Sequence, residues 1–68
     1  MPPKFERKLA EKNIPFEQRG DYTIVFTNPV PGGYENATEF TNTLLGFAKE
    51  TDARHITGEG DHIEFGPQ

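Results

Sequence analysis

The stretch Asn36–Thr51, NATEFTNTLLGFAKET, contains the clearest structural signal in the chain. Asn36 is a good N-cap residue and Glu39 stands three positions later, an arrangement that satisfies N–H groups left unpaired at the start of a helix. Small and apolar side chains then recur at helical spacing and trace one face: Ala37, Phe40, Leu44, Phe47, Ala48 and Thr51. The stretch therefore predicts an amphipathic helix whose aromatic stripe belongs to the core.

A shorter helix is predicted upstream, at residues 3–12. Phe5 and Leu9 are four positions apart, and the residues between them are good helix formers. Asn13 tolerates the left-handed conformation that ends many helices, and this ending would bring Ile14 against Leu9.

Each helix is followed by two segments that alternate in the manner of half-buried strands. After the first helix these segments are residues 14–18 and 22–26. A three-residue loop at 19–21 would set Phe16 opposite Ile24 and collect the apolar side chains on one face. We therefore predict a hairpin with this longer loop.

The second pair of strands is predicted at residues 54–57 and 62–65. The four residues between them, Gly58-Glu59-Gly60-Asp61, suit a turn. With a four-residue loop Ile56 lies opposite Ile63, and both side chains point toward the core.

The resulting order, helix-strand-strand-helix-strand-strand, predicts the α+β fold class. We expect a four-stranded, mostly antiparallel sheet with two helices packed on one face, in a single domain at residues 1–68. A chain of 68 residues buries only about 60% of the surface its unfolded form exposes, so the core is thin.

Composition limits the classes of function. The chain has no cysteine and a net charge of −4, and its acidic residues are concentrated after residue 20. Residues 1–19 carry five basic against three acidic side chains, whereas residues 20–68 carry two against eight. We expect a cytoplasmic protein without a membrane span, because no apolar run approaches about 20 residues. The acidic surface repels phosphate backbones and suits a basic protein partner.

A loop rich in proline and glycine, residues 27–35, is the predicted recognition element. Two prolines remove backbone donors and two glycines permit turns, so the segment cannot form regular structure. Together with the acidic second hairpin it gives the predicted partner-binding residues: Asn28, Val30, Tyr34, Glu59 and Asp61.

The first helix offers an alternative site for nucleic acid. Three lysines recur every four residues beside an arginine and form a basic ridge: Lys4, Arg7, Lys8 and Lys12. Such a ridge can contact phosphates, although no exposed aromatic side chains are interleaved with the lysines.

The two histidines of the second hairpin give a third hypothesis. With the register that pairs Ile56 with Ile63, the side chains of His55, His62 and Glu64 share the opposite face. Two imidazoles and a carboxylate can bind zinc or iron or serve a hydrolytic site. A Glu64–His55 pair alone would make the hairpin sensitive to pH near neutrality.

The sequence favours a non-enzymatic protein-interaction or regulatory module, such as an inhibitor. We expect no cofactor and no catalytic site, because the chain has no phosphate-binding loop and no cysteine nucleophile, and too few apolar residues for both a core and a substrate pocket. An exposed edge strand and a thin core also make a homodimer reasonable.

Overall fold

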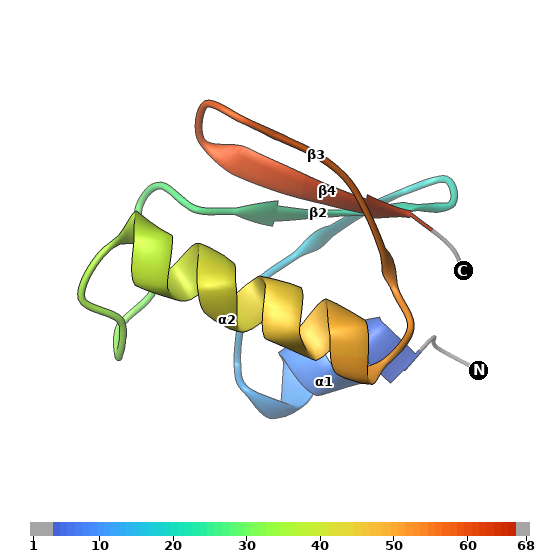
Figure 1. The fold of residues 1–68 in the computed structure, drawn as a ribbon, viewed down its shortest axis with the longest axis horizontal. Helices are drawn as coiled ribbons and strands as arrows, with labels where there is room; N and C mark the ends of the chain where they lie inside the picture. The colour runs from blue at the N-terminus through green and yellow to red at the C-terminus, as the bar shows by residue number, and fades with distance from the viewer. Residues whose placement is uncertain (1–3, 67–68) are drawn as a thin grey trace.

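The chain folds into two layers, a four-stranded sheet and a pair of helices that cover one of its faces (Figure 1). The computed structural model describes residues 4–66, except for the side chain of Glu59, so the predicted start of the first helix at residue 3 lies outside the described residues. The elements follow in the order α1 (Lys4–Glu11), β1 (Glu17–Arg19), β2 (Tyr22–Phe26), α2 (Ala37–Glu50), β3 (Arg54–Glu59) and β4 (His62–Gly66). This order confirms the α+β architecture predicted from the sequence.

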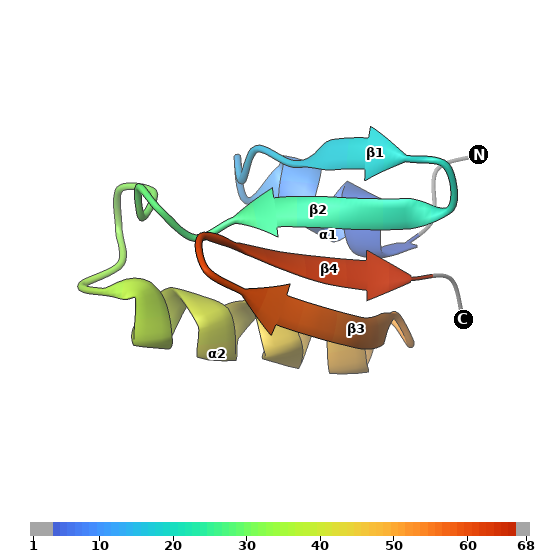
Figure 2. The ribbon, with the colours of Figure 1, turned by 90° about the horizontal axis from the view of Figure 1, so that it is seen from above.

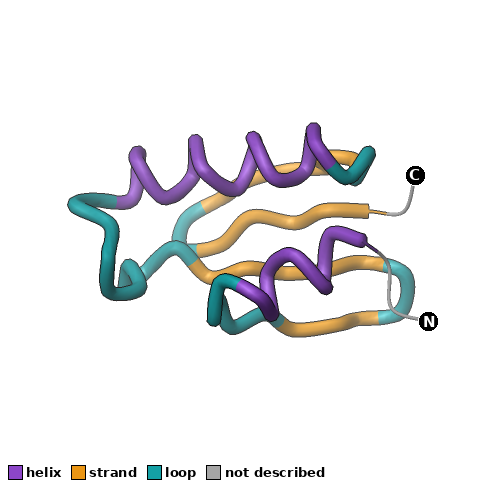
Figure 3. Tube along the Cα trace, turned by 90° about the horizontal axis from the view of Figure 1, so that it is seen from below, coloured by secondary structure: helices purple, strands orange, loops and turns teal. Residues whose placement is uncertain are grey.

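All neighbouring strands are antiparallel, and their order across the sheet is β1-β2-β4-β3. The two hairpins are therefore joined by pairing between β2 and β4, and β3 lies at the edge (Figure 2). Seen from the other side, both helices lie in front of the sheet (Figure 3). One face of the sheet is thus packed against helices, and the face toward the viewer in Figure 2 carries neither helix.

The helix ends confirm two signals in the sequence. Oδ1 of Asn36 accepts a hydrogen bond from the backbone N–H of Glu39 at 2.9 Å, which caps α2. Asn13 adopts a left-handed φ of 58°, and the N–H of Ile14 donates to the carbonyl of Leu9 at 2.9 Å. This is the backbone pattern of a Schellman ending, so α1 stops where its sequence predicts.

The core lies between the sheet and the two helices. Its members are buried apolar side chains contributed by both layers: Phe5, Leu9, Ile14, Val25, Phe40, Leu44, Ala48, Ile63 and Phe65. The rings of Phe5 and Phe65 stand 4.5 Å apart between their centroids and join α1 to β4. The stripe on α2 is part of this core through Phe40 and Leu44.

The predicted register of the first hairpin is wrong. Glu17 pairs with Ile24 and Arg19 with Tyr22, so the loop has two residues and Phe16 is not opposite Ile24. Gly20 occupies the first loop position with φ of +59°, which glycine adopts without strain and which suits a two-residue hairpin turn. The tight turn therefore prevails over the register that would gather all apolar side chains on one face.

The predicted four-residue loop of the second hairpin is also wrong, again because a glycine with positive φ forms a tighter turn. Gly60, with φ of +63°, opens a two-residue turn, and β3 continues to Glu59. Ile63 consequently lies opposite Gly58 and not opposite Ile56.

A β-bulge sets the final position of Ile56. His55 is opposite Phe65 and Thr57 is opposite Glu64, so Ile56 is the extra residue between them. An extra residue reverses the alternation of side chains along the rest of a strand. Ile56 and Ile63 therefore lie on opposite faces of the sheet, in contrast to the sequence prediction.

Candidate functional site

The face of the sheet turned away from the helices, here called the open sheet face, is the main surface left uncovered by the fold. Alternation along each strand and the pairing registers place these residues on it: Glu17, Arg19, Tyr22, Ile24, Phe26, Arg54, Ile56, Thr57, His62, Glu64 and Gly66. Side chains from β1, β2 and β4 line a shallow hollow of about 260 Å³ on this face.

Three large apolar side chains are exposed on the open sheet face. Tyr22 is 46% exposed, Phe26 43% and Ile56 41%. A Cβ atom on Gly66 would lie 2.8 Å from Cδ1 of Ile56 and 3.5 Å from Cε1 of Tyr22, so the absence of a side chain at Gly66 lets these two groups approach each other. An uncovered sheet face normally carries polar side chains, and this face departs from that pattern.

His62, the first residue of β4, lies between two carboxylates. Its Nδ1 is 3.2 Å from Oδ1 of Asp61, and its Nε2 is 3.3 Å from Oε2 of Glu64. The centroid of its ring is 6.2 Å from that of Phe26 on the neighbouring strand. A protonated imidazole can donate from both nitrogens, so both contacts favour the charged ring.

The hydrogen bond with Asp61, with further contributions from Glu64, raises the pKa of His62 above its ordinary value of about 6.5, although partial burial opposes the shift. A histidine whose pKa is raised by folding contributes stability below its unfolded pKa and loses this contribution as pH rises through its folded pKa. We therefore expect the free energy of unfolding to fall as pH rises from about 6 into the mildly alkaline range.

Denaturant titrations at a series of pH values check this expectation. The His62→Gln variant should lose most of the dependence in this window. The His55→Gln variant is the matched control, because it removes the other histidine and leaves the Asp61–His62–Glu64 cluster in place. A profile that is unchanged in His62→Gln would contradict the assignment.

The three ligands of the predicted metal site do not come together. His62 and Glu64 meet on the open sheet face, whereas His55 lies on the face toward the helices, with its ring centroid 5.8 Å from that of Phe65. The bulge at Ile56 is the cause, since it places His55 opposite Phe65 rather than Glu64. Among the side chains that the structure describes, no group of three or more histidine, aspartate and glutamate residues is arranged to hold a metal ion.

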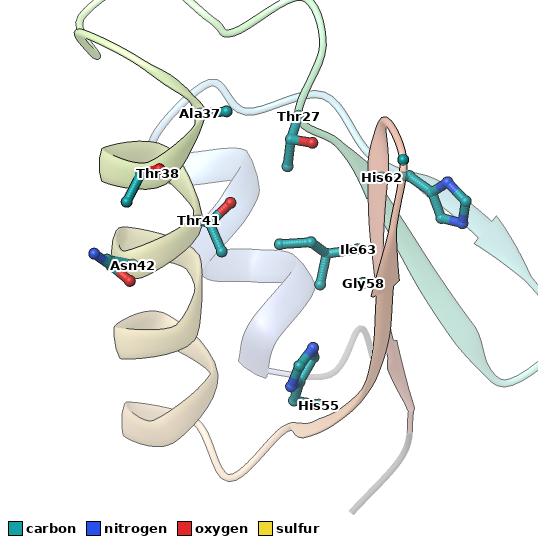
Figure 4. A pocket seen from close by; sticks show the side chains of 10 residues that line it. Thr27, Ala37, Thr38, Thr41, Asn42, His55, Gly58, His62 and Ile63 are labelled. Carbon is teal, nitrogen blue, oxygen red and sulfur yellow. The ribbon is translucent and has the colours of Figure 1, made fainter.

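A cavity of about 400 Å³ lies between the first half of α2 and strands β3 and β4. Most of its walls are threonine, asparagine, glycine and apolar side chains, and His55 points into it while His62 points away from α2 (Figure 4). The threonine and asparagine side chains among these walls are groups that bind water or a small polar molecule.

A second hollow, here called the proline groove, is more apolar and has a volume of about 550 Å³. It is formed where β1 begins and where β2 runs into the following loop: Pro15, Phe16, Glu17, Phe26, Pro29, Val30 and Pro31. Glu17 is the charged residue among these. Asp61 lies at the same end of the sheet, because its carbonyl accepts a hydrogen bond from the N–H of Thr27 at 2.8 Å.

The predicted partner-binding residues do not form one surface, because they differ in their contacts and in their exposure. Val30 lines the proline groove, and Asn28 and Asp61 are exposed. Tyr34 packs its ring against Phe40 with 4.8 Å between centroids, which gives it a role in supporting the loop. The side chain of Glu59 lies outside what the structure describes.

The predicted basic ridge on α1 is partly engaged by α2. Nζ of Lys8 is 3.7 Å from Oε1 of Glu50 and 5.3 Å from the ring centroid of Phe47. Lys4 and Arg7 line a shallow hollow of about 230 Å³ together with Lys8, and Lys12 is exposed. The contacts of Lys8 with α2 therefore interrupt the ridge near its middle.

The sequence did not identify the open sheet face as a site, and of the proline groove it identified only the loop that contributes Val30. A usable signal was present in β2, where Tyr22–Phe26 is apolar at every position except Thr23. Strands that are covered on both faces have such continuous apolar runs.

Comparisons with known proteins leave the function to be inferred from these surfaces. Within the part of the chain that the structure describes, neither helix is long and apolar enough to span a membrane. No family model, no curated protein and no solved structure matches the chain.

Proposed function

We propose that this chain is a non-enzymatic, cytoplasmic protein-interaction module that binds a short apolar segment of a basic partner protein in the proline groove and thereby regulates that partner. The observation that carries the proposal is the groove itself. Its walls are proline, aromatic and valine side chains, and Phe26 on its rim is 43% exposed. Rigid apolar concavities of this kind bind side chains with little loss of entropy on the protein's side.

Charge at the groove supports a basic partner. Glu17 lies in the groove, with its Oε1 3.1 Å from Nε of Arg19. Asp61 lies at the adjoining end of the sheet, where its side chain is exposed and its Oδ1 is 3.2 Å from Nδ1 of His62. The chain as a whole carries a net charge of −4. A lysine or arginine flanking the bound segment would be attracted to this end of the molecule, which mainly speeds and orients the encounter.

Selection from a displayed library of random twelve-residue peptides tests the proposal. We expect the selected peptides to combine large apolar residues with lysine or arginine. Glu17→Lys should weaken their binding about fivefold, since it replaces attraction by repulsion. Pro31→Asp should weaken it about tenfold or more, because it introduces a carboxylate into the apolar wall.

The matched control is Glu11→Lys, which makes the same change of charge on exposed α1 and should leave binding unchanged. Peptides that bind all variants equally, or a selection that yields no binders, would refute the proposal. The alternative of nucleic-acid binding by Lys4, Arg7, Lys8 and Lys12 is separated by titrating a fluorescent single-stranded oligonucleotide at several salt concentrations. Binding that falls with salt and is lost in a Lys4→Glu, Arg7→Glu, Lys12→Glu variant would favour that alternative.

A further inference from the structure

The cavity between α2 and strands β3 and β4 has two threonine hydroxyl groups on its walls that bond to no other described residue. Thr27 is only 7% exposed, and its hydroxyl makes no hydrogen bond within the described chain, although its backbone N–H donates to Asp61. Thr41 is half-buried on α2, and its hydroxyl is equally without a partner among these residues. Figure 4 shows both threonines around the same space. Buried hydroxyl groups are normally hydrogen-bonded, so these two indicate a site for a polar ligand.

Threonines elsewhere on the same helix bond to its backbone instead. The hydroxyl of Thr43 donates to the carbonyl of Glu39 at 3.0 Å, and that of Thr51, at the end of the helix, donates to the carbonyl of Phe47 at 2.8 Å. Threonine in a helix commonly bonds in this way to the residue four positions earlier. Thr41 makes no such bond, so its hydroxyl stays available to the cavity.

The walls of the cavity are uncharged apart from any charge that its histidines acquire. Among the described residues that line it there is no lysine, arginine, aspartate or glutamate, although these types make up 26% of the chain. His62 points away from α2, so His55 is the titratable side chain that reaches into the space (Figure 4). Ile63 adds an apolar wall. A charged ligand would lose hydration here without gaining an ion pair, which favours an uncharged one.

The volume of the cavity favours a ligand over a single bridging water. It measures about 400 Å³. Small-molecule sites typically measure roughly 300–1,000 Å³, whereas one water occupies about 30 Å³. The walls come from the residue after β2, from α2 and from the second hairpin, and Ile63 among them belongs to the core. Because core packing holds these elements together, the site is formed before a ligand binds.

We propose that this cavity binds a small uncharged molecule that carries amide or hydroxyl groups on an apolar body. The hydroxyl groups of Thr27 and Thr41 can each donate and accept, so they pair with either end of an amide. Ile63 contacts the apolar part of the ligand, and the imidazole of His55 offers a further hydrogen bond. The inference goes beyond the proposed function, because the cavity and the proline groove share no lining residue.

Three probes of similar size and shape test the charge of the ligand. Benzamide is neutral, benzoate is an anion and benzamidinium is a cation, and each is titrated at neutral pH into the full chain labelled with ¹⁵N. We expect benzamide to shift the backbone resonances of Thr27, Thr41 and Gly58 with a dissociation constant of about 1 mM. The charged probes should bind about fivefold more weakly or worse, because neither finds an opposite charge.

The same titrations can overturn the inference. Benzamide that leaves these resonances unmoved up to tens of millimolar would do so, because the cavity would then not bind the class of ligand proposed. A charged probe that binds as tightly as benzamide would also do so, because the walls would then not select for neutrality.

The Thr41→Val variant removes one of the hydroxyl groups and keeps nearly the same shape. We expect it to weaken benzamide binding about fivefold through the loss of a hydrogen bond. The matched control is Thr43→Val, which makes the same change on the same helix at a residue that does not line the cavity and whose hydroxyl bonds to Glu39. An equal loss of binding in the two variants would contradict the assignment of the cavity.

The Thr27→Val variant separates a role in binding from a role in the fold. Because the hydroxyl that it removes bonds to no described residue, thermal melts followed by circular dichroism should show an unchanged or higher melting temperature. Benzamide binding should still weaken about fivefold or more. A lower melting temperature with unchanged binding would show that the hydroxyl serves the fold, and the inference would fail.

Discussion

Truncating Phe65 to alanine is expected to lower the free energy of unfolding by about 3–5 kcal/mol. Phe65 is 1% exposed, and its ring stands 4.5 Å from that of Phe5, so it joins the sheet to α1 at the centre of the core. Domains of this size have a total stability of roughly 3–10 kcal/mol. The variant should therefore be largely unfolded near physiological temperature, which circular dichroism and denaturant titration will measure.

Phe26→Ala is the matched control for this prediction, since it makes the same chemical change on the open sheet face. Because Phe26 is 43% exposed, the loss should be about 1 kcal/mol or less when measured at low protein concentration. Equal losses in the two variants would mean that the core is not organised around Phe65.

Replacing Thr23 with valine is expected to destabilise the fold by about 1–3 kcal/mol, although valine has nearly the same shape. The hydroxyl of Thr23 donates a hydrogen bond to Oε2 of Glu6, and both side chains are buried between α1 and β2. Oε1 of Glu6 is buried without a hydrogen-bond partner among the described residues. Removing the hydroxyl would leave the whole carboxyl group without a partner in the core, which is costly.

The double variant Glu6→Leu, Thr23→Val should recover this loss and reach or exceed the stability of the original chain. Replacing both members of a buried polar pair by apolar groups removes the cost of burying the pair. A double-mutant cycle based on urea titrations measures the coupling between the two side chains. If the double variant is no more stable than Thr23→Val alone, the unpartnered carboxyl group of Glu6 is not the source of the lost stability.

The sequence alone predicted only part of the surfaces that are proposed to bind partners. The segment that contributes Val30 was identified from its prolines and glycines, and it does line the proline groove. Phe16 and Phe26 complete the groove, but they come from segments on either side of a hairpin, and their approach depends on its register. The exposure of Tyr22 and Ile56 depended on register as well.

What the sequence by itself determined is the local structure. The capping of α2 by Asn36, the ending of α1 at Asn13 and the succession of two helices and four strands follow from interactions between residues a few positions apart. Such interactions are encoded in spacing, because helix caps and the 3.6-residue period are properties of short segments.

Only the tertiary structure decided which face each strand residue occupies. Two glycine turns and one bulge set the registers. Because side chains alternate with a period of two, the loss of one residue from the first predicted loop and the extra residue of the bulge each moved side chains to the other face. For this reason His55 lies on the face opposite to that of His62 and Glu64, and Ile56 lies on the open sheet face. Pairing between distant strands, β2 with β4, then determined that these side chains form one continuous surface.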